Sequence, residues 1–112
     1  MKREYEDYLR DMLENAEKAL TFVQGLDYDG FCKDDKALYA VIRALEIIGE
    51  AARRVSQETR DQYPQIPWRE MTSMRNLVIH EYDVVDINQV WDTVQNKIPP
   101  LIEELVKIVP PE

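Results

Sequence analysis

The stretch AVIRALEIIGEAARRV, residues 40–55, decides the fold, because the helix that it predicts carries two apolar stripes. One stripe repeats every three or four residues, like a coiled-coil seam, and mostly small residues form the other. One stripe packs a helix onto its own domain, so two stripes predict a helix buried on two sides. The seam contains Leu38, Val41, Leu45, Ile48, Ala52 and Val55, and the small stripe contains Ala37, Ala40, Ala44, Ile47 and Ala51.

Two interpretations of the second buried side remain open. The small stripe faces a partner subunit, as in a homodimer, or the helix is the central helix of a bundle within one chain. This helix is expected to begin at Asp34 or Asp35, either of which can cap it, and to reach about Gln57 or beyond.

Upstream, one apolar stripe predicts a first helix from about Arg3 to Val23, and Gly25 ends it. The following segment, GLDYDGFCKDD, reads as a turn-rich connection. Its Asp27 and Asp29 are placed as in a calcium loop. The third oxygen ligand and the closing glutamate are missing, which excludes that kind of site.

Downstream, the two prolines of YPQIPWREMTS, residues 63–73, mark an irregular connector that Trp68 and Met71 are expected to pin to the core. A short third helix is predicted over MRNLVIHEY, residues 74–82. A last helix is predicted to begin after Asp86, where the spacing to Gln89 is that of a capping box.

The last helix has to bend at Pro99-Pro100, because proline lacks the N–H and clashes with the preceding turn. Its apolar pattern resumes afterwards, so we expect a kinked helix. The four main segments predict an all-α protein, an up-and-down four- or five-helix bundle that forms a single domain over residues 1–112.

The composition of the chain argues against several classes of protein and of site. The chain has no run of about 18 apolar residues and no signal-peptide pattern, so it is expected to be cytoplasmic. The single cysteine excludes an internal disulfide framework and a cysteine-rich zinc site, and with one histidine as well no metal site is expected. The net charge of −8 opposes nonspecific nucleic-acid binding. Only the central third, residues 36–75, is basic, with seven bases against five acids.

That basic third runs into RNLVIHEY, residues 75–82, which holds the single histidine. Histidine is the usual general acid–base at neutral pH, since its ordinary pKa is about 6.5. Arginine supplies a permanent charge and several donors suited to a phosphate. Arg75 and His80 therefore form a minimum set for phosphodiester chemistry, to which Asn76 adds an amide and Tyr82 a phenol.

The spacing within this motif favours a site shared between two chains. Five residues along a helix correspond to a rotation of roughly 140°, so Arg75 and His80 would diverge on one helix. Two copies around a two-fold axis could direct both pairs into one cleft. The structural alternatives are a histidine that caps a helix end and, for Tyr82, a core or interface aromatic. Nearby glutamates, Glu46 and Glu50, are expected to pair with Arg43, Arg53 and Arg54 and to stay solvated.

At RNLVIHEY the sequence resembles the HEPN superfamily, and within it the HepT-like toxins of prokaryotic toxin–antitoxin pairs. Arg75, Asn76, His80 and Tyr82 match the pattern Arg-x4-His-x-Tyr with a polar residue after the arginine. AVIRALEIIGEAARRV, IPWREM and IPPLIEEL resemble the same family in the same order, so the likeness covers essentially the whole chain.

The resemblance implies a HEPN-like helical homodimer that cleaves RNA without a metal. Arg75 and His80 would be catalytic, with Asn76 supporting, in a composite site at the dimer interface. The products would be a 2′,3′-cyclic phosphate and a 5′-OH. The partner would be a minimal (MNT-type) nucleotidyltransferase antitoxin, which uses ATP to transfer AMP to Tyr82 and so silences the toxin.

Two other functions compete with the toxin ribonuclease. A noncatalytic helical partner would bind nucleotide or regulate a nucleotidyltransferase without cutting RNA, and the acidic net charge favours it slightly. A purely structural dimerisation module would require that neither Arg75 nor His80 is exposed.

Overall fold

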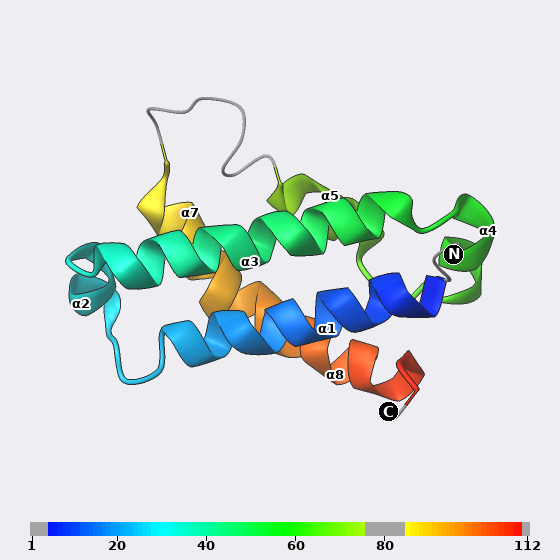
Figure 1. The fold of residues 1–112 in the computed structure, drawn as a ribbon, viewed down its shortest axis with the longest axis horizontal. Helices are drawn as coiled ribbons and strands as arrows, with labels where there is room; N and C mark the ends of the chain where they lie inside the picture. Colours follow the sequence, from blue (N-terminus) through cyan, green and yellow to red (C-terminus); the bar gives the residue numbers. More distant parts are fainter. Residues whose placement is uncertain (1–4, 76–84, 111–112) are drawn as a thin grey trace.

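The computed structural model describes residues 5–75 and 85–110, and within these ranges it consists of helices without a strand. This confirms the all-α prediction. None of the described helices is long and apolar enough to span a membrane. The elements are α1 (Tyr5–Phe22), α2 (Tyr28–Cys32), α3 (Asp35–Arg54), α4 (Gln57–Gln62), α5 (Trp68–Met74), α7 (Ile87–Asp92), the π-helical segment η1 (Thr93–Lys97) and α8 (Ile98–Ile108) (Figure 1).

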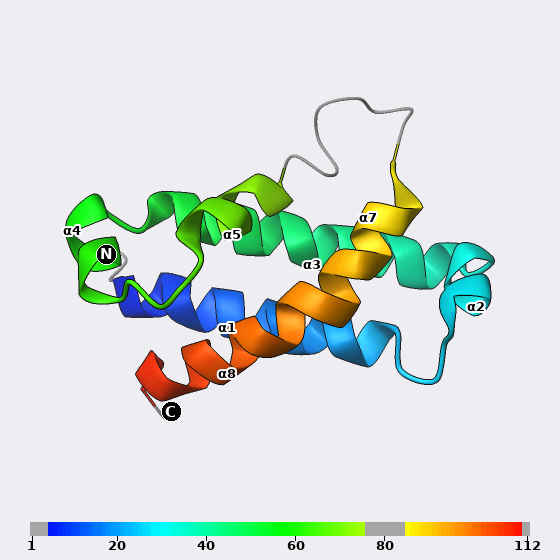
Figure 2. The same cartoon turned by 180° about the vertical axis from the view of Figure 1, so that it is seen from behind.

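The two longest helices, α1 and α3, run antiparallel and side by side along the length of the molecule (Figure 1). Figure 2 shows the other side of this pair, where α7 and α8 cross it and α5 lies along α3. The main contacts are those of α3 with α1 and α5, and of α1 with α8. The helical bundle predicted from the sequence is therefore confirmed, with α3 at its centre.

Helix α3 is buried by its own chain on both stripes. The seam residues Val41, Leu45, Ile48 and Ala52 are fully buried. Most of the small stripe is buried as well, since only Ala40 and Ile47 in it remain half-exposed. Because α1, α2 and α5 all contact α3, the central-helix interpretation accounts for most of the second stripe. A partner subunit at the remaining exposed strip stays a prediction.

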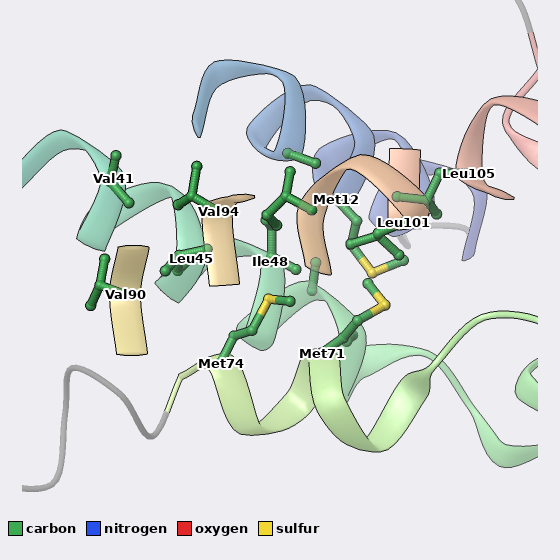
Figure 3. Close-up of a cluster of buried hydrophobic side chains, with 14 of the residues drawn as sticks. Met12, Val41, Leu45, Ile48, Met71, Met74, Val90, Val94, Leu101 and Leu105 are labelled. Carbon is green, nitrogen blue, oxygen red and sulfur yellow. The ribbon is translucent and has the colours of Figure 1, made fainter. Parts of the chain in front are cut away.

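The core forms where side chains of α1, α5 and the C-terminal elements α7, η1 and α8 converge on α3 (Figure 3). Ile48 lies at the middle of this cluster and is 0% exposed. Apolar contacts of this kind hold the crossing helices in place, since each buried aliphatic side chain contributes about 1.5–3 kcal/mol. The other labelled members are Met12 of α1, Val41 and Leu45 of α3, Met71 and Met74 of α5, and Val90, Val94, Leu101 and Leu105 of the C-terminal helices.

Truncating this centre should be costly. We expect Ile48→Ala to lower the free energy of unfolding by about 2–5 kcal/mol, because it removes buried methyl groups and leaves a cavity. Tyr39→Ala on the same helix is the control, since Tyr39 is 74% exposed and its loss should change stability by less than about 0.5 kcal/mol. Urea denaturation at one protein concentration measures both, and equal effects would contradict this packing.

The prediction that residues 25–35 form only a turn-rich connection is wrong, because the short helix α2 lies within them. Gly25 does end α1, with a left-handed φ of 81°. Asp27 then caps α2 by accepting a hydrogen bond from the Gly30 N–H at 2.8 Å. Phe31 is fully buried, with its ring centroid 5.1 Å from that of Trp91. Burial of this ring against α7 favours a helical turn that local propensity does not predict.

The prediction that the second helix reaches Gln57 or beyond is also wrong. Helix α3 ends at Arg54, and Val55 is extended at φ −78° and ψ 128° while its side chain is buried. Ser56 then caps a separate helix, α4, by accepting a hydrogen bond from the Thr59 N–H. A strong N-cap residue directly after a buried valine therefore reverses the chain at this point.

The corner between α3 and α5 is held by one arginine. Arg60 donates hydrogen bonds to the carbonyl oxygens of Ala52, at 2.9 Å, and Val55, at 3.1 Å, at the end of α3. Its guanidinium also lies 5.7 Å from the centre of the Trp68 ring. Carbonyls at a helix C-terminus need such donors. The prediction that residues 63–73 are irregular is wrong from Trp68 onward, where α5 begins. With Met71 fully buried and Trp68 packed on the core, the expected pinning of this segment is confirmed.

The last helix begins after Asp86, which accepts a hydrogen bond from the Gln89 N–H, as predicted. It continues through η1 into α8, so the expected continuation past Pro99-Pro100 is confirmed. The prolines cannot donate to the carbonyls one turn earlier, and η1 lies directly before them. A wider π turn allows the helix to continue despite the missing donors, and it is a recognised cause of helix bending.

Candidate active site

Of the motif residues, only Arg75 lies within the described part of the chain. Asn76, His80 and Tyr82 lie outside the described residues, as does most of the helix predicted over residues 74–82. Helix α5 ends at Met74, so Arg75 follows it directly, with a helical φ of −60° and ψ of −35°.

The position of Arg75 is fixed by the helix that precedes it. Met71 and Met74 are buried in the core on the face of α5 that contacts α3, at 0% and 3% exposure. Figure 3 shows both methionine side chains pointing from α5 into the apolar cluster. Because α5 is anchored on this face, Arg75 is presented from a fixed helix end.

Arg75 also touches α3 directly, at a glycine. A Cβ atom built on Gly49 would lie 2.9 Å from both the backbone nitrogen and the Cβ of Arg75, a separation that real Cβ contacts essentially never show. Glycine in a helix interior costs about 1 kcal/mol relative to alanine. At this position its lack of a side chain allows the backbone of Arg75 to approach α3 closely.

The Arg75 side chain forms an ion pair with the next residue of α3. Its Nε lies 2.5 Å from Oε1 of Glu50, and the two side chains are 34% and 39% exposed. The N–H is not aligned on the oxygen as a hydrogen bond requires, and Nε itself is shielded from solvent. The contact is therefore a close charge pair at the edge of the core, with part of the arginine still accessible.

Two further arginines lie beside Glu50 on this surface. Arg53 Nη1 lies 3.5 Å from the same Oε1 of Glu50. Glu50, Arg53 and Arg54 line a cavity of about 270 Å³, and Glu50 and Arg54 also line a neighbouring cavity of about 290 Å³ between α1 and α3. Glu50 thus pairs with Arg53 and Arg75 and shares a hollow with Arg54, while Asp11 adds a second carboxylate to the neighbouring hollow.

The close approach at Gly49 makes a sharp prediction for stability. We expect Gly49→Ala to lower the free energy of unfolding by about 1–3 kcal/mol, because the added methyl group would overlap the backbone of Arg75. Helix propensity alone predicts the opposite sign, a gain of about 1 kcal/mol. Urea denaturation decides between them, and a stabilised variant would contradict the contact.

The sequence predicted that Glu46 and Glu50 pair with Arg43, Arg53 and Arg54, and this is correct for Arg43 and Arg53. The pairs Glu50–Arg53 and Glu46–Arg43 are present, but Arg54 has no ion pair within the described residues. The contact between Glu50 and Arg75 was missed, because helical spacing reveals only neighbours on one helix. A glycine inside a strong helix was the available signal, since it often marks a close approach.

The exposure of Arg75 and the grouping of possible metal ligands bear on the interpretations that the sequence left open. Arg75 keeps a third of its side chain accessible, which disfavours the purely structural module for this residue. Across residues 5–75 and 85–110, no three His, Cys, Asp or Glu side chains are grouped as a metal site would require.

The fold and this arginine site define an all-α protein that presents Arg53, Arg54 and Arg75 around Glu50 where α3 meets α5. The family model described as Ribonuclease HepT-like matches residues 12–108, and the chain belongs to this HepT-like ribonuclease family. No solved structure matches the chain.

Relatives of matching length support the assignment. A protein of Thermococcus cleftensis named Probable ribonuclease HepT is 43% identical over 108 residues, which cover 96% of this chain and 98% of the relative. A candidate RNase of Methanocaldococcus jannaschii is 39% identical over 104 residues, covering 93% and 95%. Another candidate RNase, from Caldanaerobacter subterraneus, is 35% identical over 105 residues, covering 94% of each chain.

Proposed function

We propose that this chain is the toxin of a toxin–antitoxin pair and acts as a metal-independent endoribonuclease. The observation that carries the proposal is the family match over residues 12–108, together with the accessible Arg75, which lies with Arg53 beside Glu50. The net charge of −8 makes these arginines important, since most of the surface repels a phosphate backbone.

The proposed reaction is an internal transphosphorylation of RNA. The ribose 2′-oxygen forms a bond to the adjacent phosphorus, and the bond from phosphorus to the 5′-oxygen breaks. His80 accepts the proton of the 2′-OH, while the leaving 5′-oxygen takes up a proton. Arg75 stabilises the charge that develops on the phosphorane, and Asn76 supports it. The products are a 2′,3′-cyclic phosphate and a 5′-OH.

The site is proposed to be complete only in a homodimer. On a single helix, Arg75 and His80 would point in directions roughly 140° apart. A two-fold axis would allow the motifs of two chains to face one cleft. The half-exposed strip of α3 around Ala40 and Ile47 supports this arrangement, because it leaves apolar surface for a partner.

The proposed regulation is the transfer of AMP to Tyr82 by an MNT-type nucleotidyltransferase antitoxin. The antitoxin uses ATP: the Tyr82 oxygen forms a bond to the α-phosphorus and pyrophosphate leaves. This chain needs no cofactor of its own. An AMP group two residues from His80 would add bulk and negative charge beside the cleft and so repel an RNA phosphate.

Incubation with the antitoxin and ATP tests the switch. Wild-type protein should gain one AMP and lose RNA cleavage, whereas Tyr82→Phe should gain none and stay active. Tyr39→Phe is the matched control, because Tyr39 is 74% exposed and thus open to adventitious transfer. Intact-mass measurement and an RNA cleavage assay read both properties. AMP transfer to Tyr82→Phe, or full activity of the modified wild type, would contradict the proposal.

The noncatalytic regulator makes a different prediction. It would bind nucleotide or the nucleotidyltransferase without cutting RNA, and His80→Ala would leave that binding mostly intact. Protein shown by mass to be free of AMP, and still inactive on RNA, would favour this second function.

A further inference from the structure

The contact between Glu50 and Arg75 is made through one edge of the guanidinium. Glu50 Oε1 lies against Nε, which is shielded from solvent. An arginine has five N–H donors, one on Nε and four on the two terminal nitrogens. The carboxylate therefore holds the arginine at Nε, while the two terminal nitrogens carry the donors that bind a phosphate in two-point fashion.

Stability does not account for this ion pair. Both side chains are about a third exposed, and ion pairs of this exposure contribute only about 0–1 kcal/mol. A carboxylate beside an arginine that must bind RNA also repels the substrate. A contact that stabilises little and opposes substrate binding is best explained by what it does to the arginine's orientation.

The surroundings of Glu50 keep its carboxylate in place. Its backbone is in α3 directly after Gly49, the residue that lies against the backbone of Arg75. Arg53, one helical turn further on, lies 3.5 Å from the same oxygen. The backbone contact with Gly49 and the ion pair with Glu50 thus fix the backbone and the guanidinium of Arg75 on one short stretch of α3. A side chain with this many rotatable bonds otherwise loses considerable entropy when it is held for catalysis.

We propose that Glu50 is a positioning residue, which orients Arg75 so that its terminal nitrogens face the scissile phosphate. The proposal deepens the proposed ribonuclease function and rests on it. Arg53 supports the same carboxylate oxygen of Glu50. Glu50 itself touches neither RNA nor the reacting atoms.

Removing the carboxylate should lower kcat and leave KM unchanged or reduced. A small misplacement of a catalytic group costs up to about 10²-fold in rate, so we expect kcat of Glu50→Ala to fall by about 10–100-fold. KM should not rise, because a negative charge beside the substrate is lost. Glu50→Gln keeps an acceptor oxygen at the same reach and should recover part of the loss.

The matched control is Glu46→Gln, one turn earlier on the same helix and paired with Arg43 instead. It should leave kcat and KM unchanged. In an Arg75→Ala background, Glu50→Ala should cost no further activity, since the residue it positions is gone. If Glu50 had a purely structural role, Glu50→Ala would instead lower the activity by the same factor in the wild-type and in the Arg75→Ala background.

A measurement without RNA separates this proposal from the ribonuclease itself. The Arg75 Nε–H resonance, assigned by its loss in Arg75→Ala, should exchange slowly with water in the wild type and faster in Glu50→Ala. Slow exchange in both would overturn the positioning role, as would an unchanged or increased kcat in Glu50→Ala. If Glu50→Ala does not fold, as judged by circular dichroism, Glu50→Gln decides by the same two readouts. An inactive wild type with a Glu50-dependent resonance would refute the ribonuclease and leave the positioning contact standing.

Discussion

Replacing His80 with alanine is expected to lower the rate of RNA cleavage by about 10²–10⁴-fold, because general acid–base catalysis typically contributes that much. His80 is the only histidine of the chain, so no neighbouring imidazole can substitute for it. The measurement is a single-turnover cleavage rate on end-labelled RNA.

Two properties must match for this comparison to be valid. The variant and the wild type should have the same dimer content by light scattering, and both should be free of AMP by mass. Cleavage by His80→Ala at the wild-type rate would show that another group moves the proton.

Replacing Arg75 with alanine is expected to cost about 10²–10³-fold in kcat, the typical loss when one well-placed stabiliser of developing charge is removed. Arg75→Lys should recover only part of the lost kcat, since lysine keeps the charge but lacks the planar fork of donors. Steady-state kinetics on the same RNA measure both variants.

Arg43→Ala is the control for charge alone, because Arg43 is an exposed arginine on α3 that pairs with Glu46. It removes one positive charge and should leave kcat unchanged. If Arg43→Ala and Arg75→Ala reduce cleavage equally, then the arginines act only by attracting RNA, and no special role belongs to Arg75.

The long helices could be predicted because their apolar patterns and caps agree. The local signals are the apolar stripe of α1, the two stripes of α3 and the cap at Asp86, and tertiary packing reinforces each of them. The short helices could not be predicted in the same way. Helix α2 depends on the burial of Phe31 against Trp91, and a contact between distant residues leaves no trace in local periodicity.

The sequence proposes the site as a set of residue types and says nothing of their arrangement. RNLVIHEY identified Arg75 because it combines a permanent cation with a histidine five residues later. Its partner Glu50 lies on another helix, and helix crossings determine which residues meet. Gly49 was the one local sign of that crossing, since an interior glycine is unfavourable unless another backbone comes close.

The central claim is that this chain cleaves RNA by attack of the 2′-OH without a metal. The most direct test is to incubate 5′-end-labelled RNA with AMP-free wild-type protein in EDTA and to analyse the new ends. We predict 2′,3′-cyclic phosphate and 5′-OH ends from the wild type and none from His80→Ala. No cleavage by the AMP-free wild type, or cleavage that requires added metal and leaves 5′-phosphate ends, would contradict the claim.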